Sequence, residues 1–297
     1  MSRKKPTAAK PLGFAASYDN EENVATIRMD WPKIPAEQWF LLQSDEHFDN
    51  EHCDRELYKR HLDEAIERNA GIIKFGDTFC VMQGPGDKRS SLSALRDAHK
   101  QSDYFNRVLD DAVEFHRPYA KNMIGVGIGN HESSVTKKYG WDITQLFVDR
   151  LRRECGSPVI RMGYSGWLRF LVTANATRRS SLRLWYTHGY GGGGPVTLDS
   201  IQSQRQMAFV HGADITVSGH THDSWIIERV AIGLSDCGKQ TRKTTVQVKL
   251  PTYKDEYGKG EGGWHIETGK PPKPLGAYWL RCFTVNSVLS FEVQRAR

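Results

Sequence analysis

The chain has 297 residues, of which 38% are hydrophobic and 26% charged, and its formal net charge is +6. These proportions are ordinary for a soluble globular protein, and the length is ample for one large core. No apolar run approaches the roughly 18 residues that a membrane span needs. The N-terminus also lacks the apolar stretch of a secretory signal, so we expect a cytoplasmic protein without membrane contact.

The positive charge is concentrated at the N-terminus. Residues 1–18 contain Arg3, Lys4, Lys5 and Lys10 and no acidic residue, so the rest of the chain is nearly neutral. We expect this segment to be a flexible basic tail; contact with an acidic partner such as nucleic acid is the alternative. The five cysteines are scattered without CxxC spacing, which indicates reduced thiols.

Short apolar runs alternate along the chain with segments of helical spacing. A buried strand is predicted over 39–43 and a helix over 56–69. The next strand, over 71–75, precedes a helix over 103–117, and a third apolar run covers 121–129. Each of these strand-like runs gives way to a polar loop, a pattern that indicates alternating strands and helices.

The alternation continues through the middle of the chain. A helix is predicted over 141–155, a strand over 181–187, a helical stretch over 197–212 and a strand over 213–218. From Trp225 onward the pattern changes to short β-like runs separated by Gly/Pro-rich loops. Strands alternating with helices predict an α/β fold.

Five of the strand-like runs end in clusters of polar residues. The clusters are Asp45-Glu46-His47, Gly76-Asp77, Gly129-Asn130-His131-Glu132, His188-Gly189 and Gly219-His220-Thr221-His222. In open α/β sheets ligands bind where strand ends converge. The converging carboxylate, amide and imidazole groups suit Mn, Fe or Zn, and the lack of thiolates argues against a structural zinc site.

The order D-x-H, G-D, G-N-H-E, H-G, G-H-x-H resembles the calcineurin-like metallophosphoesterase superfamily over Asp45 to His222. The resemblance implies a four-layer α/β/β/α sandwich with two mixed sheets, formed by a single domain over 19–297. The β-rich part from about 225 would complete the second sheet. The stretch 252–283 also resembles members found in phages and prophages, for which the host cytoplasm would be the compartment.

The resemblance assigns a role to each motif residue. Asp45, His47 and His222 would bind one metal ion, Asp77 would bridge both, and Asn130, His188 and His220 would bind the second. His131 would lie over the phosphate and stabilise charge or protonate the leaving oxygen. The implied nucleophile is a hydroxide between two divalent ions, with Mn expected and Fe, Zn or Ni as alternatives. Glu132 stands where many members have Asp, with little expected consequence for the chemistry.

Other residues are candidates for substrate contacts. Lys88 and Arg89, in the loop after Asp77, could contact phosphates, although a solvated loop face is an equal alternative. Tyr253 lies in a Gly-rich segment and could stack on a base or simply pack. The glycines at 191–194 are interpreted as a loop that must pass close to the metals rather than as a phosphate cradle.

The sequence therefore predicts a metal-dependent phosphoester hydrolase. Our first choice is a phosphodiesterase acting on nucleic acid, DNA or RNA, or on nucleotides. A phosphomonoesterase or protein phosphatase is the alternative, because a two-metal site does not discriminate between them. A mononuclear hydrolase and a non-catalytic binding protein on the same fold are further alternatives. The oligomeric state, and an exonuclease or endonuclease mode, are left open.

Overall fold

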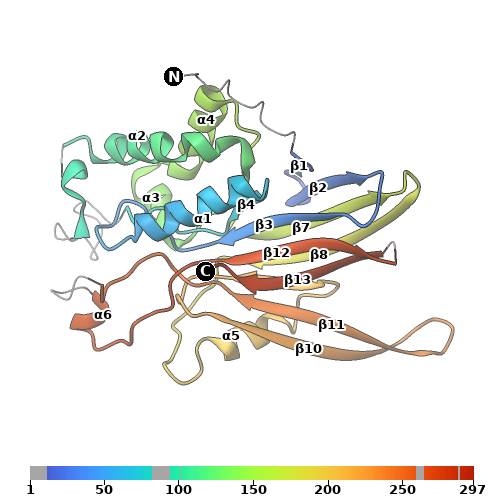
Figure 1. Cartoon of the computed structure of the whole chain (residues 1–297). Helices are drawn as coiled ribbons and strands as arrows, with labels where there is room; N and C mark the ends of the chain where they lie inside the picture. The colour runs from blue at the N-terminus through green and yellow to red at the C-terminus, as the bar shows by residue number, and fades with distance from the viewer. Residues whose placement is uncertain (1–11, 82–93, 101, 259–263, 287) are drawn as a thin grey trace, which may run out of the picture.

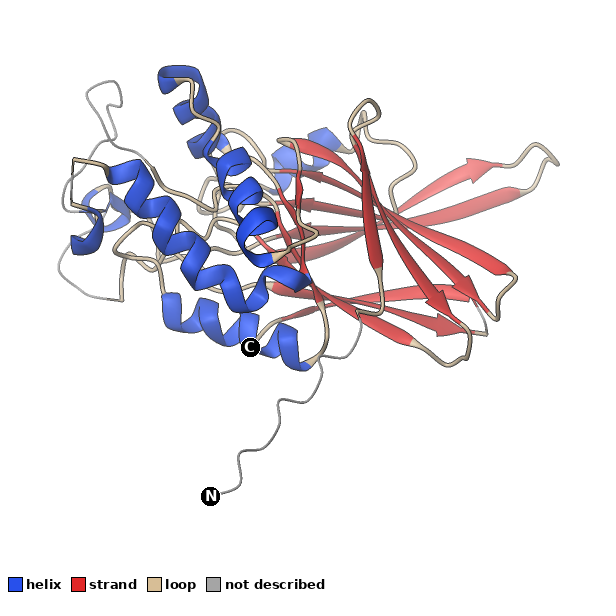
Figure 2. Ribbon diagram, turned by 90° about the horizontal axis from the view of Figure 1, so that it is seen from above, coloured by secondary structure: helices blue, strands red, loops and turns tan. Residues whose placement is uncertain are grey.

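Two mixed β-sheets pack face to face in the computed structural model, and helices cover the outer face of one of them (Figures 1 and 2). The structure describes residues 12–297, except for 82–93, 101, 259–263 and 287. The α/β sandwich predicted from the sequence is thereby confirmed as the fold class.

The six-stranded sheet carries three of the five motifs. Its order is β13 (Val288–Arg295), β12 (Tyr278–Val285), β3 (Glu37–Gln43), β4 (Gly71–Lys74), β5 (Met123–Val126) and β6 (Ile160–Arg161). Strands β3 to β6 run parallel, whereas β12 pairs antiparallel with both β3 and β13. The parallel arrangement brings the carboxyl ends of β3, β4 and β5 to one edge.

The seven-stranded sheet carries the other two motifs. Its order is β1 (Ala15–Asp19), β2 (Val24–Trp31), β7 (Ser165–Ala174), β8 (Arg178–Thr187), β9 (Ile215–Ser218), β11 (Gln240–Lys249) and β10 (Trp225–Leu234). Strands β8 and β9 are parallel, so their carboxyl ends also lie together. Burial alternates along β2 and β7, as expected for strands with one face toward a core.

An apolar core fills the space between the sheets. Phe40 from β3 meets Phe170 from β7 with ring centroids 4.9 Å apart, and Met29, Leu184 and Leu280 are fully buried around them. These side chains come from both sheets, so neither sheet can bury its inner face without the other.

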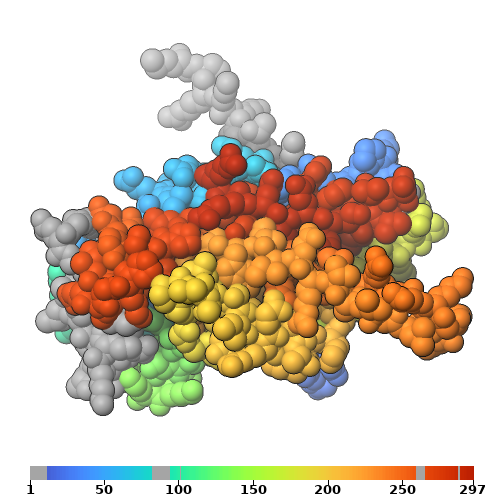
Figure 3. Space-filling model, turned by 90° about the horizontal axis from the view of Figure 1, so that it is seen from below, coloured from blue at the N-terminus to red at the C-terminus, as the bar shows by residue number. Residues whose placement is uncertain are grey.

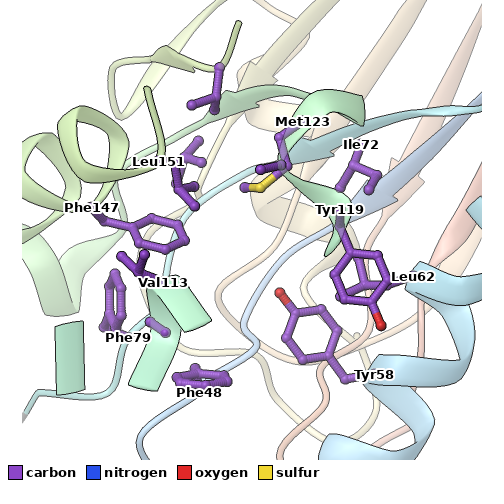
Figure 4. Close-up of a cluster of buried hydrophobic side chains, with 14 of the residues drawn as sticks. Phe48, Tyr58, Leu62, Ile72, Phe79, Val113, Tyr119, Met123, Phe147 and Leu151 are labelled. Carbon is purple, nitrogen blue, oxygen red and sulfur yellow. The ribbon is translucent and has the colours of Figure 1, made fainter. Parts of the chain in front are cut away.

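A second core lies between the six-stranded sheet and the helices (Figure 4). Helices α1 (Arg55–Glu67), α2 (Tyr104–His116) and α4 (Ile143–Cys155) supply its outer wall. The shorter elements are η2 (Asp97–His99), η3 (Arg117–Asn122), α3 (Asn130–Tyr139) and α6 (Trp264–Glu267). Helix α2 ends before Pro118, as the sequence predicts.

A fourth layer lies on the outer face of the seven-stranded sheet and is thin. It contains α5 (Ser200–Gln206), whose Gln204 bonds Gln247 of β11 at 3.1 Å. Phe209 follows the helix and packs edge-on against Trp185 of β8, with ring centroids 6.2 Å apart. Both contacts use residues of opposite parity to the inter-sheet core, which places α5 outside the sandwich.

Two expectations about the ends of the chain need correction. Strand β1 begins at Ala15, inside the segment 1–18 expected as a flexible tail, because Ala16 and Tyr18 pack against the inter-sheet core. The part from Trp225 onward does not complete one sheet: β10 and β11 join the seven-stranded sheet, and β12 and β13 the six-stranded one.

Within the described residues, no helix has the length and apolarity needed to cross a membrane.

Burial of His61 in α1 predicts a loss of stability in acid. Its Nδ1 lies 2.9 Å from the Tyr253 hydroxyl, and burial lowers its pKa to about 4. Between about pH 6.5 and 4 the unfolded chain binds a proton at His61 that the folded chain does not, so the free energy of unfolding falls as pH falls. We expect His61→Asn to flatten this slope in urea unfolding, while the exposed His211→Asn leaves it unchanged. Equal slopes for His61→Asn and the wild type would contradict this account.

Candidate metal centre

Loops from both sheets meet at one end of the sandwich. Hydrogen bonds continue between neighbouring chain segments after the strands end: Asp45 N–H donates to the Gly76 carbonyl and His47 N–H to the Asp77 carbonyl, each at 3.0 Å. The two sheets are joined there because the His220 N–H donates to Asp45 Oδ2 at 2.9 Å. The predicted motif residues are thus held together by backbone hydrogen bonds within the six-stranded sheet's loops and by one backbone-to-carboxylate hydrogen bond between the sheets.

The motif side chains form two three-residue groups. Asp45, His47 and His222 form one group, and Asp77, His188 and His220 form the other, with the ligand atoms of each within 4.8 Å of one another. Asn130 joins the second group, since its Oδ1 lies 2.8 Å from His220 Nδ1 and 3.1 Å from His188 Nε2. The resemblance implies the same grouping, except that it places Asp77 between both ions. The role of these residues as metal ligands and the bridging position of Asp77 stay predictions.

Hydrogen bonds to backbone carbonyls set the tautomers in the second group. His188 Nδ1 lies 3.0 Å from the Phe75 carbonyl and His220 Nε2 lies 2.9 Å from the Gly191 carbonyl. A carbonyl only accepts, so each of these nitrogens carries the proton. In the neutral rings the other nitrogens then present lone pairs to Asn130 Oδ1, which is also an acceptor. A cation bound between these atoms would attract all of the lone pairs that face one another. Imidazoles whose other nitrogen is held by a backbone carbonyl are also common metal ligands.

The first group shows the same need for a positive partner. Asp45 Oδ2 accepts from the Ser44 hydroxyl at 2.6 Å and from the His220 N–H, whereas its buried Oδ1 has no hydrogen-bond partner among the described residues. This Oδ1 lies 3.3 Å from His222 Nε2, which in turn lies 3.1 Å from His47 Nε2. One carboxylate oxygen and two imidazole nitrogens fit a borderline divalent cation.

The charges of the groups depend on one another. Burial disfavours the carboxylates of Asp45 and Asp77, but nearby histidines outweigh it and hold the pKa of both carboxyls below the usual range. Burial also disfavours the imidazolium of His188, yet Asp77 and Asp45 raise its pKa to about 9. His47, by contrast, has its pKa lowered well below the usual value by burial and by its neighbours His131 and His222. Without a cation, a histidine proton therefore supplies the balancing charge.

Unusual backbone conformations aim these side chains. The residues with positive φ include Asp45, His47, Asp77, His220 and His222. Non-glycine residues adopt this region rarely, and such strain persists where the surrounding contacts enforce it. The motif glycines have a related role, because a Cβ at Gly219 would overlap the Asp45 carboxylate and one at Gly129 would overlap that of Asp77.

His131 lies beside the second group at the start of α3. Its backbone N–H donates to Asp77 Oδ1 at 3.0 Å, and its Nδ1 donates to the Cys80 carbonyl at 2.6 Å. The Nε2 lies 3.7 Å from Asp77 Oδ2. The ring is therefore fixed with Nε2 toward the centre, the nitrogen that a proton-transfer role requires.

Glu132 supports the loop that carries Asp77. Its carboxylate accepts the backbone N–H groups of Gly129 at 2.8 Å, Phe79 at 2.9 Å and Asp77 at 3.2 Å. Burial and the nearby Asp77 charge raise its pKa to about 8. Glu132 thus acts on the position of Asp77.

A buried ion pair beneath the centre was missed by the sequence analysis. Glu46, between Asp45 and His47, accepts from Lys74 Nζ at 3.0 Å, and both side chains are fully buried. The ammonium also donates to the Tyr58 hydroxyl from α1. Burial lowers the pKa of Lys74 and raises that of Glu46, and their mutual attraction opposes both shifts. The pair ties the first motif to β4 and to the helical layer.

The C-terminal segment around Tyr253 also holds the first motif. The Asp45 carbonyl accepts from Thr252 Oγ1 at 2.6 Å and from Tyr253 N–H at 3.2 Å. Farther along, the ring of His265 lies 6.0 Å from that of His222. No spacing in the sequence indicates the place of His265 beside the motif.

The structure gives a different outcome for each of the features that were predicted to lie near the substrate. Tyr253 is fully buried, with its hydroxyl 2.8 Å from Gln43 Nε2, so the proposed stacking on a base is wrong: no ring face reaches solvent. Lys88 and Arg89 lie outside the described residues. The carbonyl of Gly191 fixes the tautomer of His220, which agrees with a loop that passes close to the centre.

Cys80 completes a third group with His47 and His131. Burial raises the pKa of its thiol to about 12, and Asn50 Nδ2 donates to its sulfur at 3.3 Å. A protonated thiol is a poor metal ligand, so the two oxygen- and nitrogen-based groups remain the stronger candidates.

No family model matches the chain, and no curated protein matches it significantly. The chain resembles the solved structure of Thermotoga maritima protein TM1076 at 12% identity and a TM-score of 0.33, over 87% of this chain and 99% of that one. Vacuolar Protein Sorting 29 from Cryptosporidium parvum is similar at 13% identity and a TM-score of 0.32, over 88% and 98%.

GAP50, described as the anchor in the inner membrane complex of Plasmodium, is similar at 10% identity and a TM-score of 0.38, over 88% of this chain and 89% of that one. Likenesses with TM-scores of 0.38 or less carry no argument about this chain. The fold class therefore rests on the chain's own sheets, and the candidate centre on its own contacts.

The buried ion pair gives a test of how the first motif is held. Lys74→Met should lower the free energy of unfolding by about 3–5 kcal/mol, because it leaves the Glu46 carboxylate buried and unpaired. The double variant Lys74→Met/Glu46→Gln should cost less than Lys74→Met alone. Lys59→Met, which removes a pair with Asp63 at the surface, should leave the midpoint of urea unfolding close to that of the wild type, because solvent screens this pair. If the double variant loses as much stability as Lys74→Met and Glu46→Gln lose separately when their effects are added, the two residues act independently.

Proposed function

We propose that the chain is a metal-dependent phosphoester hydrolase and, as our first choice, a phosphodiesterase acting on nucleic acid or nucleotides. The observation that supports it best is the pair of adjacent groups of carboxylate and imidazole side chains, whose ligand atoms lie within 4.8 Å of one another, with Asn130 Oδ1 beside the second group. Mn is the expected metal because carboxylate, amide and imidazole ligands suit it. The looser likeness to phage members stays a prediction.

Divalent cations in such a centre would polarise the phosphoryl group and lower the pKa of a bound water. Asp45, His47 and His222 would hold one ion, and Asp77, Asn130, His188 and His220 the other. Hydrogen bonds to backbone carbonyls fix the tautomers of His188 and His220. The second nitrogen of each ring therefore already points into the centre before a metal binds. His131, with Nδ1 held by the Cys80 carbonyl, would use Nε2 to bind the phosphoryl oxygen or protonate the leaving oxygen.

Basic residues beside the first group support an extended anionic substrate. His265 lies next to His222, and burial together with the nearby His222, Lys254 and Lys270 lowers the pKa of His265 to about 4, against the opposing effect of Glu256. Lys254 pairs with Glu256 and lowers the pKa of His47 as well, which places its charge near the first group. The two lysines place positive charge beside the first group, which favours a substrate with more than one phosphate, as in nucleotides and nucleic acid.

The experiment compares Mn²⁺-dependent turnover of bis(p-nitrophenyl) phosphate with that of p-nitrophenyl phosphate. We expect faster turnover of the diester, no turnover in Asp77→Asn, and a fall in kcat of about 10²–10⁴-fold in His131→Asn with Mn²⁺ binding retained. His211→Asn, at an exposed histidine, is the matched control and should keep wild-type rates.

Preference for the monoester would replace the phosphodiesterase choice with a phosphatase. Turnover that persists in Asp77→Asn would show that the observed rate does not come from this centre. If the chain neither turns over substrate nor binds Mn²⁺, the hydrolase proposal is wrong.

A further inference from the structure

Asp49 is a buried carboxylate that belongs to neither group of the candidate centre. It is 1% exposed and accepts three hydrogen bonds. Its Oδ1 accepts from the Cys80 N–H at 2.6 Å. Its Oδ2 accepts from the Val81 N–H at 2.9 Å and from the Tyr104 hydroxyl of α2. All three donors are uncharged groups, so the negative charge of the carboxylate is shared among them.

The C-terminal segment covers the loop that follows Asp49. The Asp54 N–H donates to the Tyr253 carbonyl at 2.8 Å. The Asp255 N–H donates to the His52 carbonyl at the same distance. Figure 3 shows the stretch after β11, in orange and orange-red, on the outside of the molecule. The Asp49 carboxylate therefore lies inside the protein, where it can act only through its hydrogen-bond partners.

The peptide group between Cys80 and Val81 connects this carboxylate with His131. The N–H of the peptide group belongs to Val81 and donates to Asp49 Oδ2. Its carbonyl belongs to Cys80 and accepts from His131 Nδ1 at 2.6 Å. The carboxylate and the imidazole are thus bonded to opposite ends of one conjugated group. Hydrogen bonds in such a chain polarise and strengthen one another.

The backbone at this peptide group is strained. Val81 has a φ of 40°, and a positive φ is an outlier for a β-branched residue. Strain of this kind persists where the surrounding contacts enforce it, and it is concentrated at functional sites. The contacts here are the hydrogen bonds to Asp49 and the packing of Val81 in the core beneath the helices. They hold the peptide group with one end toward Asp49 and the other toward His131.

We propose that Asp49 is a positioning residue for His131 and acts through the peptide group between Cys80 and Val81. The carboxylate draws on the N–H of this group, which makes the carbonyl a stronger acceptor for His131 Nδ1–H. A stronger bond at Nδ1 fixes the ring with Nε2 toward the centre and stabilises positive charge on the imidazole. The effect on catalysis rests on the proposed hydrolase function, whereas the coupling between Asp49 and His131 does not.

Proton NMR tests this coupling without any turnover. In the full chain without added metal, the His131 Nδ1–H should give a downfield imidazole resonance, identified by its loss in His131→Asn. Asp49→Asn removes the negative charge, so we expect the resonance to move upfield. Tyr104→Phe removes a donor that competes for the same oxygen and leaves more charge for the Val81 N–H. The resonance should therefore move further downfield in Tyr104→Phe.

The opposite signs separate the proposal from a general loosening of the loop, which would move the resonance upfield in both variants. Asp214→Asn is the matched control, because Asp214 also accepts a backbone N–H, from Arg183, but lies in the other sheet. It should leave the resonance unchanged. If Asp49→Asn does not fold, as judged by circular dichroism, the downfield shift in Tyr104→Phe decides. Shifts of the same sign in Asp49→Asn and Tyr104→Phe, or no shift in either, would overturn the proposal.

A double-variant cycle tests the effect on catalysis. With Mn²⁺ and bis(p-nitrophenyl) phosphate, Asp49→Asn should lower kcat by about 10–100-fold and leave KM nearly unchanged, as is common for partners that orient an imidazole from outside a site. The variant Asp49→Asn/His131→Asn should be no slower than His131→Asn, because Asp49 acts through that ring. Asp214→Asn should keep the wild-type rate.

A double variant slowed by the product of the two single effects would show that Asp49 acts on something other than His131, and the proposal would be wrong. A wild-type chain without turnover would instead refute the hydrolase function. In that case the two NMR shifts alone would decide whether Asp49 is coupled to His131.

Discussion

The constraint on which the site depends is the burial of two carboxylates and several imidazoles in one space at the end of a sandwich. Asp45 is fully buried and Asp77 nearly so, and a buried carboxylate is costly unless a positive partner lies within a few ångströms. The chain meets this cost with His188, whose pKa the two carboxylates raise to about 9. A divalent cation in each group would meet the same cost while leaving the imidazoles neutral.

The rest of the fold fixes that arrangement from outside. The sheets bring five strand ends together, and the backbone bonds after β3 and β4 keep the loops in register past the strands. The Glu46–Lys74 pair ties one loop to the helical layer, and Thr252 ties the same loop to the C-terminal segment. Positive φ at Asp45 and His47 is tolerated because these contacts determine the loop from three sides. Rigidity of this kind is what a preformed ligand set requires.

The sequence predicted the features that local patterns encode. Apolar runs followed by Asp, Asn or His placed the motif residues at strand ends, and helical spacing placed α1, α2 and α4 close to their observed bounds. The fold class followed from that alternation and the motif order. The tail was misjudged because its few apolar residues, Ala16 and Tyr18, form a strand only by packing on a core built from distant segments.

The features that the sequence did not predict depend on distant contacts. Lys74 ends an apolar strand. Its ammonium can be buried because Glu46 and Tyr58 accept its hydrogen bonds, and these two residues approach it only in the folded chain. Thr252 bonds the Asp45 carbonyl across a separation of 207 residues, so no local pattern marks it. Tyr253 was interpreted as a stacking residue because its neighbours are polar, whereas its ring is covered by His61 and Tyr58.

The most direct test of the account is a crystal structure of the chain grown with Mn²⁺, with anomalous diffraction used to locate the metal. We predict two anomalous peaks per chain, one among Asp45, His47 and His222 and one among Asp77, Asn130, His188 and His220. Ordered side chains in the positions described here without any peak at saturating Mn²⁺ would contradict it, since the facing lone pairs would then be satisfied by protons alone.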